Sequence, residues 1–288
     1  MPDIWALATV AATFATYLGV LASTGLVLVR IAFAREIRLI HVSLVRQTTA
    51  FALLGLFASI IGFALTGAAL TGDSSGLTDL EMLGLLSRTP VGSSVAVRLV
   101  GLALVLAGIW IPRFGLPIAA AGALLSAWSF TIVGHSTGAG QFWLGGVLLL
   151  HLAGVSFWVG ILSPLREIAG KQEFLSEAAG LGRRFGQVAR FTVPGLIAAG
   201  VYLAWSLLGD FASLATTSYG LALLAKIGLV ACLLAAAAAN KFRFVPAMEK
   251  EDCKAAVRLR QSIVVEWVAV CLIILATAVL TTVTTPPA

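Results

Sequence analysis

Eight long apolar segments dominate the sequence, and little of the chain is left over for a soluble domain. They cover approximately residues 4–29, 47–71, 97–111, 116–133, 141–163, 191–209, 219–240 and 261–283. A helix needs roughly 20 mostly apolar residues to cross the hydrocarbon core of a bilayer. A membrane β-barrel would instead alternate apolar and polar residues. The sequence therefore predicts an all-α, polytopic membrane bundle of eight transmembrane helices embedded in the lipid bilayer.

The distribution of positive charge predicts the orientation of this bundle. Of the 19 Lys and Arg residues, 16 fall in alternate loops, within 30–46, at Arg113, within 166–190 and within 241–260. Loops rich in Lys and Arg stay on the cytoplasmic side, so we expect both termini on the periplasmic or extracellular side. The net charge of +6 follows from these loops, and it gives no reason to expect a nucleic-acid partner.

Two stretches of the chain are similar to each other. Residues 89–107 align without gaps on residues 217–235, and Arg98 then stands opposite Lys226. Both side chains lie near the outer end of an apolar segment, where a long cationic side chain can reach, or snorkel to, the interface. We treat snorkelling as the simplest interpretation of both residues.

A weaker similarity places Gly25 opposite Gly160. Together the two similarities predict a parallel internal repeat of two four-helix halves, residues 1–133 and 134–288, an arrangement known in transporters. The alternative is a chance alignment of helices rich in Gly and Leu.

Four ionisable residues near or within the apolar segments are candidates for function, because such a group is costly in lipid unless it has a partner. They are His135, His151, Lys226 and Glu266. His151 lies ten residues after Gln141, close to the expected midplane. Imidazole is a common metal ligand and proton relay. His135 lies roughly 15 Å further out, so the two histidines would be successive binding positions along a path. The alternative role for His151 is a hydrogen bond to a neighbouring helix.

The remaining candidates are two cysteines and one carboxylate. Cys232 and Cys271 lie near the same depth as His151, and sulfur together with imidazole suits copper(I), although a buried cysteine often acts as a small apolar residue. Glu266 lies towards the inner end of the last segment, where it would pair with Arg258 or Arg260, or accept a proton.

Several short motifs in the second half resemble one family. They are GH at 134–135, HLAGVSFWVG at 151–160, RRFGQVARF at 183–191, TTSYGLALLAKIGL at 216–229, NKFRFVP at 240–246 and LRQSIVVEWV at 259–268. In order and spacing they resemble the copper resistance protein D (CopD/PcoD-like) family of bacterial inner-membrane proteins. The resemblance implies copper transport across the cytoplasmic membrane, alongside a separate periplasmic copper-binding protein of the CopC type. It matches His135 and His151 to the family's histidines, and Lys226, Asn240 and Glu266 to its polar positions.

Three functions stay open on the sequence alone. The first is a non-enzymatic copper permease, working in uptake, in which the histidines relay the ion from the outer face to the midplane; no ATP-binding motif is present. The second is a haem-binding electron carrier, although paired histidine ligands would have to lie at similar depth. The third is a membrane dock or sensor for a periplasmic copper chaperone, which needs no histidine at the midplane.

Overall fold

The computed structural model describes residues 4–112, 114–133, 142–208 and 212–283, and in these ranges the chain is helical without β-strands. The long helices are α1 (Ile4–Ala32), α2 (His41–Thr71), α4 (Pro90–Trp110), α5 (Gly115–Trp128), α6 (Phe142–Ile168), α7 (Leu175–Leu208), α9 (Ser218–Ala239) and α11 (Cys253–Thr282). The short helices are α3 (Leu80–Ser87), α8 (Ser213–Thr216) and α10 (Val245–Met248), and a π-helical turn, η6 (Asn240–Phe244), follows α9. Short 3₁₀ turns are η1 (Arg38–Ile40), η2 (Ser74–Leu77), η3 (Ser129–Thr131) and η5 (Gln172–Phe174).

Seven helices in the described ranges are long and apolar enough to cross a membrane. The predicted segment 116–133 is helical too, as α5 with η3, but it is shorter than the other seven. At 1.5 Å per residue it reaches about 25 Å, somewhat less than the hydrocarbon core of a typical bilayer. The all-α, multi-pass membrane bundle is thus confirmed, and the eighth crossing stays a prediction.

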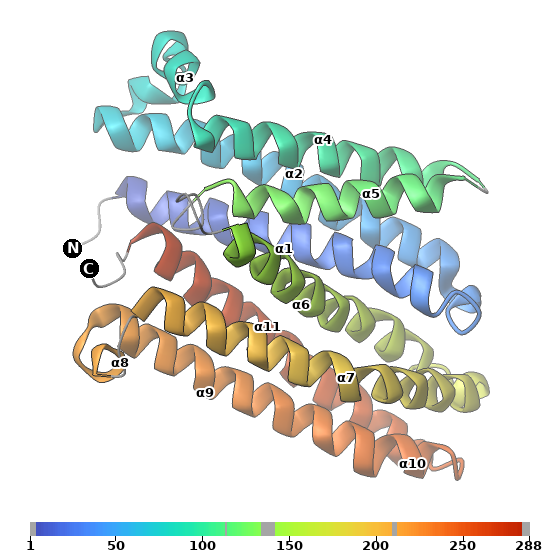
Figure 1. The fold of residues 1–288 in the computed structure, drawn as a ribbon. Helices are drawn as coiled ribbons and strands as arrows, with labels where there is room; N and C mark the ends of the chain where they lie inside the picture. Colours follow the sequence, from blue (N-terminus) through green and yellow to red (C-terminus); the bar gives the residue numbers. More distant parts are fainter. Residues whose placement is uncertain (1–3, 113, 134–141, 209–211, 284–288) are drawn as a thin grey trace.

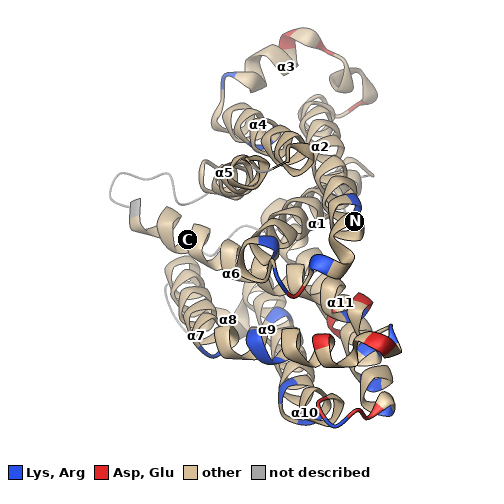
Figure 2. Cartoon of the chain, turned by 90° about the vertical axis from the view of Figure 1, so that its right-hand side faces the viewer, with Lys and Arg blue, Asp and Glu red and all other residues tan. Residues whose placement is uncertain are grey.

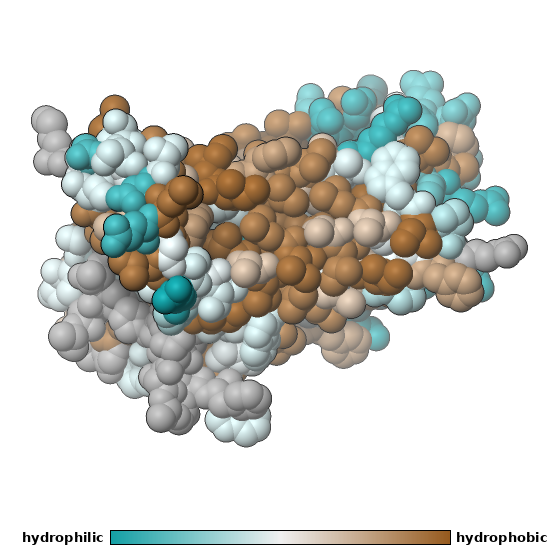
Figure 3. All heavy atoms as spheres, turned by 90° about the horizontal axis from the view of Figure 1, so that it is seen from above, coloured by the Kyte–Doolittle hydropathy of each residue, from teal (hydrophilic) through white to brown (hydrophobic). Residues whose placement is uncertain are grey.

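The helices run roughly side by side between two ends of different character. The first described helix begins and the last one ends at the same end, where α3 and α8 also lie (Figure 1). At the opposite end, Lys, Arg, Asp and Glu gather around α10 and the neighbouring helix ends (Figure 2). A broad hydrophobic band separates the two ends on the face seen in Figure 3. We call the end with α10 the basic end; its cytoplasmic location stays a prediction from the positive-inside rule.

Helix α1 lies between two hydrophobic clusters. Its Leu26 belongs to a cluster shared with α6 and α11, whereas its Val27 belongs to a second cluster with α2, α4 and α5. A helix that is apolar on all sides is expected to be buried in this way. Helix α1 therefore joins the two groups of helices that the sequence divides at residue 133.

Glycines allow α1 and α6 to cross at close range. A Cβ atom placed on Gly25 would lie 1.9 Å from the carbonyl oxygen of Ser156, and one on Gly160 would lie 2.2 Å from the carbonyl carbon of Gly25. Small residues at such crossings let membrane helices approach closely. Gly25 and Gly160 are also the positions matched by the weaker sequence similarity, and a two-fold repeat would bring equivalent residues together in this way. The repeat itself stays a prediction.

Candidate functional site

His151 lies where α6 packs against α7. Its partly buried ring packs against Gly200 of α7, where an added Cβ atom would lie 3.3 Å from Cε1 of the imidazole. The backbone carbonyl of Leu196 lies beside the ring, and the charge of Lys226 on α9 acts on it. Within the described part of the chain, Nδ1 of His151 is buried without a hydrogen-bond partner. The site thus offers an imidazole nitrogen with no competing protein donor.

Glu266 forms a second buried polar site closer to the basic end. Its side chain on α11 is almost fully buried and accepts a hydrogen bond from Nδ2 of Asn240, the first residue of η6. The indole of Trp158 on α6 also lies beside Glu266. Nε1 of Trp158 and Oδ1 of Asn240 are buried and otherwise lack partners among the described residues. We call Glu266, Asn240 and Trp158 the carboxylate cluster.

The carboxylate cluster corrects one expectation and adds two residues. Glu266 does not pair with Arg258 or Arg260, since neither forms an ion pair in the part of the chain that the structure describes. Asn240 was indicated only through the family resemblance, and Trp158 was not indicated as a site residue at all. The spacing in the sequence could have indicated Trp158, because it follows His151 by seven residues and both therefore lie on one face of α6. The two sites are therefore stacked along α6, about 10 Å apart along its axis.

In the described part of the structure, neither Cys232 nor Cys271 belongs to a conventional group of metal ligands. Cys232 is exposed on α9, and Cys271 is partly exposed on α11, where it lines a groove together with Gln47 and Trp267. In the described ranges no three His, Cys, Asp or Glu side chains lie close enough together to hold a metal ion. His135 lies outside the described residues. Copper binding by His135, His151, Cys232 and Cys271 stays a prediction.

Arg98 does not snorkel to the surface, contrary to the simplest interpretation of the sequence. Its side chain is buried within the bundle and donates hydrogen bonds of 3.0 Å to the hydroxyls of Ser94 and Ser129. Its guanidinium also lies 4.3 Å from the centre of the Phe130 ring, a cation–π contact. The face of α4 that carries Arg98 turns towards α5 and η3, and no hydropathy pattern reveals this rotation. The matching residue, Lys226, is partly buried on α9.

These features define a class of protein: a multi-pass α-helical membrane protein with buried polar groups stacked inside its C-terminal half. Residues 1–146 match the family described as the copper resistance protein D-like N-terminal domain, and residues 179–280 match copper resistance protein D. A curated copper resistance protein D from Pseudomonas syringae pv. tomato is 28% identical over 249 residues, which cover 78% of this chain and 79% of that protein. No solved structure matches the chain significantly. The chain belongs to the copper resistance protein D family, as the motifs in its second half indicated.

Proposed function

We propose that this chain is a non-enzymatic permease that carries copper inward across the bacterial inner membrane. The observation that carries the proposal is Nδ1 of His151, which is buried where α6 packs against α7 and has no hydrogen-bond partner among the described residues. Neutral imidazole nitrogen is a good copper ligand. Membership of the copper resistance protein D family supports copper as the transported ion.

The proposed path runs through the second half of the bundle. His135 receives the ion at the outer end, from a periplasmic protein of the CopC type, and His151 holds it next. Nδ1 of His151 has no hydrogen-bond partner among the described residues, so in the tautomer that carries the proton on Nε2 its lone pair is free to bind copper. The carboxylate of Glu266 on α11, beside Trp158 of α6, then attracts the ion towards the basic end.

Lys226 has a specific part in this scheme. Its positive charge acts on the His151 ring and repels any cation bound there. Conduction requires a site that binds well enough to be entered but weakly enough to be left. Lys226 thus weakens copper binding at His151 enough for the ion to leave again. An inside-negative membrane potential favours inward release of the ion by about 2.3 kcal/mol per charge per 100 mV.

The first half of the bundle is less suited to a cation. Arg98 is buried there, and its hydrogen-bond acceptors in the described residues are neutral hydroxyl groups. A buried guanidinium without a neighbouring carboxylate makes the local potential positive. The second half also carries a cation, Lys226, but among the described residues it alone offers a buried carboxylate, Glu266, and this supports a path restricted to the second half.

The test is copper binding and uptake by the purified full chain under reducing conditions. Wild type is compared with His151→Ala and with a matched control, His41→Ala, which changes an exposed histidine at the basic end. We expect His151→Ala to lose bound copper and copper uptake into proteoliposomes, with both retained in His41→Ala. Equal copper binding by all three proteins would overturn the proposed path and favour a docking role at the outer end.

A further inference from the structure

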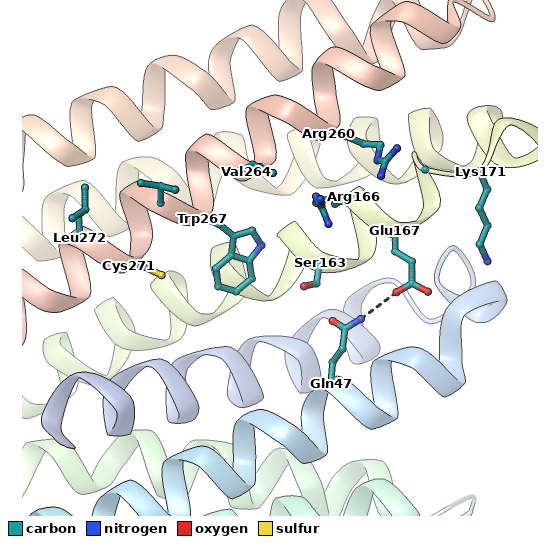
Figure 4. Close-up of a pocket in the computed structure, with 12 residues that line it drawn as sticks. Gln47, Ser163, Arg166, Glu167, Lys171, Arg260, Val264, Trp267, Cys271 and Leu272 are labelled. Atoms are coloured by element: carbon teal, nitrogen blue, oxygen red, sulfur yellow. Dashed lines mark hydrogen bonds between the residues drawn. The ribbon is translucent and has the colours of Figure 1, made fainter. Parts of the chain in front are cut away.

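A groove of about 720 Å³ opens at the basic end between α2, α6 and α11 (Figure 4). Its polar part holds the side chains of Arg166, Lys171 and Arg260, and its other part is apolar and includes Trp267 and Leu272. It lies apart from His151, which contacts α7, and the path proposed above does not use its residues, although Cys271, a candidate copper ligand, lines it. The groove therefore needs an explanation of its own.

The cationic side chains of the groove form no ion pair within the described part of the chain. Neither Arg166 nor Arg260 forms an ion pair in the described ranges, and Nε of Arg260 is buried without a hydrogen-bond partner. The neighbouring carboxylate of Glu167 is already engaged, since its Oε2 accepts hydrogen bonds from Ser43 (2.7 Å) and Gln47 (3.1 Å) of α2. Leaving a buried N–H unsatisfied is costly, so the site favours a ligand rich in acceptor oxygens. The planar guanidinium group of arginine can donate two parallel hydrogen bonds to the oxygens of one phosphate group.

The apolar wall of the groove limits the kind of phosphate that fits. Val264, Val268 and Leu272 recur every four residues and so lie on one face of α11. Their exposed fractions are 44%, 55% and 44%. This exposed strip runs from the arginines into the membrane-spanning part of α11. A free phosphate would use only the polar part, whereas a phospholipid would use both.

We propose that this groove binds an anionic glycerophospholipid of the surrounding membrane. The lipid phosphate lies between Arg166 and Arg260, with Lys171 close to the headgroup, and an acyl chain lies along Val264, Val268 and Leu272. The charge complementarity fits the expected orientation, because anionic lipids give the cytoplasmic leaflet a negative surface that basic sites between helices recognise.

The experiment is native mass spectrometry of the full chain in detergent, titrated with phosphatidylglycerol or with phosphatidylcholine. We expect one phosphatidylglycerol to be retained at least about tenfold more strongly than phosphatidylcholine, because each basic side chain adds to the affinity for anionic lipid. The double variant Arg166→Gln/Arg260→Gln should lose this preference. The matched control is Arg243→Gln/Arg258→Gln, which removes the same charge from two exposed arginines of the basic end. Equal retention of the two lipids by wild type, or equal loss in both double variants, would overturn the proposal.

A second variant separates a lipid from a free anion and does not depend on the arginine variants folding. Val268→Trp fills the apolar part of the groove and leaves every charge in place, so phosphatidylglycerol binding should fall. Inorganic phosphate at millimolar concentration should not displace the lipid from wild type. Unchanged lipid binding by Val268→Trp, or full displacement by phosphate, would reduce the groove to a simple anion site and contradict the proposal.

Discussion

Asn240 donates a hydrogen bond from Nδ2 to Oε1 of Glu266, and this buried contact joins the π-helical turn after α9 to α11. Single π-helical turns inside α-helices are frequent at functional sites. Here the turn follows α9 directly, and Asn240 is its first residue. The same contact thus holds the end of α9 in place and positions the carboxylate that we place at the inner end of the copper path.

Two substitutions of Glu266 should separate its structural and transport roles. Glu266→Gln keeps an acceptor for Asn240, so we expect a small change in thermal stability but slower copper uptake, because the negative charge is gone. Glu266→Leu leaves the amide of Asn240 unpaired and should lower the free energy of unfolding by about 1–3 kcal/mol. Melting in detergent and uptake into proteoliposomes measure the two effects. Wild-type uptake by a well-folded Glu266→Gln protein would remove Glu266 from the path.

The apolar segments predicted the helices well but not where several of them begin. The predicted segment 97–111 belongs to α4, which begins at Pro90, where the missing N–H of proline costs nothing in the first turn. Helix α7 begins at Leu175, well before the predicted apolar segment at 191. Its first turns are charged, so hydropathy does not detect them although they are helical.

How far along α6 His151 lies could be read from the sequence, but the direction that it faces could not. Counting residues from the start of an apolar segment places His151 near the midplane, yet only packing shows that it faces Gly200. The rotation of each helix about its own axis decides such contacts. In a helix that is apolar on nearly every side, the sequence carries little information about that rotation. The same reason explains why Arg98 was expected at the surface and is buried.

The contact between Gly200 and His151 gives a test that leaves the histidine unchanged. Gly200→Val should push the imidazole away from α7 and weaken copper binding by about ten- to hundredfold, as loss of a supporting contact does at metal sites. The matched control is Gly195→Val on the same helix, where an added Cβ atom meets nothing within 4 Å. Titration of copper(I) against a competing chelator measures the affinity. If Gly200→Val binds copper as tightly as Gly195→Val does, then the packing of His151 against α7 is irrelevant to binding.

The crossing of α1 and α6 should be sensitive to a single methyl group. Gly25→Ala would place Cβ against the Ser156 backbone, which cannot move aside as a side chain can, and overpacking of this kind costs about 1–3 kcal/mol. We expect a lower melting temperature in detergent, with copper stoichiometry unchanged in the folded fraction. Gly228→Ala is the control, because its surroundings are open. Equal melting temperatures for the two variants would show that the helices do not cross as closely as described.

The predicted repeat puts Lys226 and Arg98 at matching positions in its two halves, so replacing each with Met tests whether the copper path lies in the second half. Lys226→Met removes the charge that repels a cation at His151, so copper should bind several-fold more tightly and leave more slowly. Arg98→Met removes a cation held by Ser94 and Ser129 in the first half, and copper affinity and uptake should stay at the wild-type level. Copper titration and stopped-flow release from the purified proteins measure both quantities. A change in copper affinity with Arg98→Met but not with Lys226→Met would move the path to the first half, because electrostatic repulsion acts most strongly on the nearest ion.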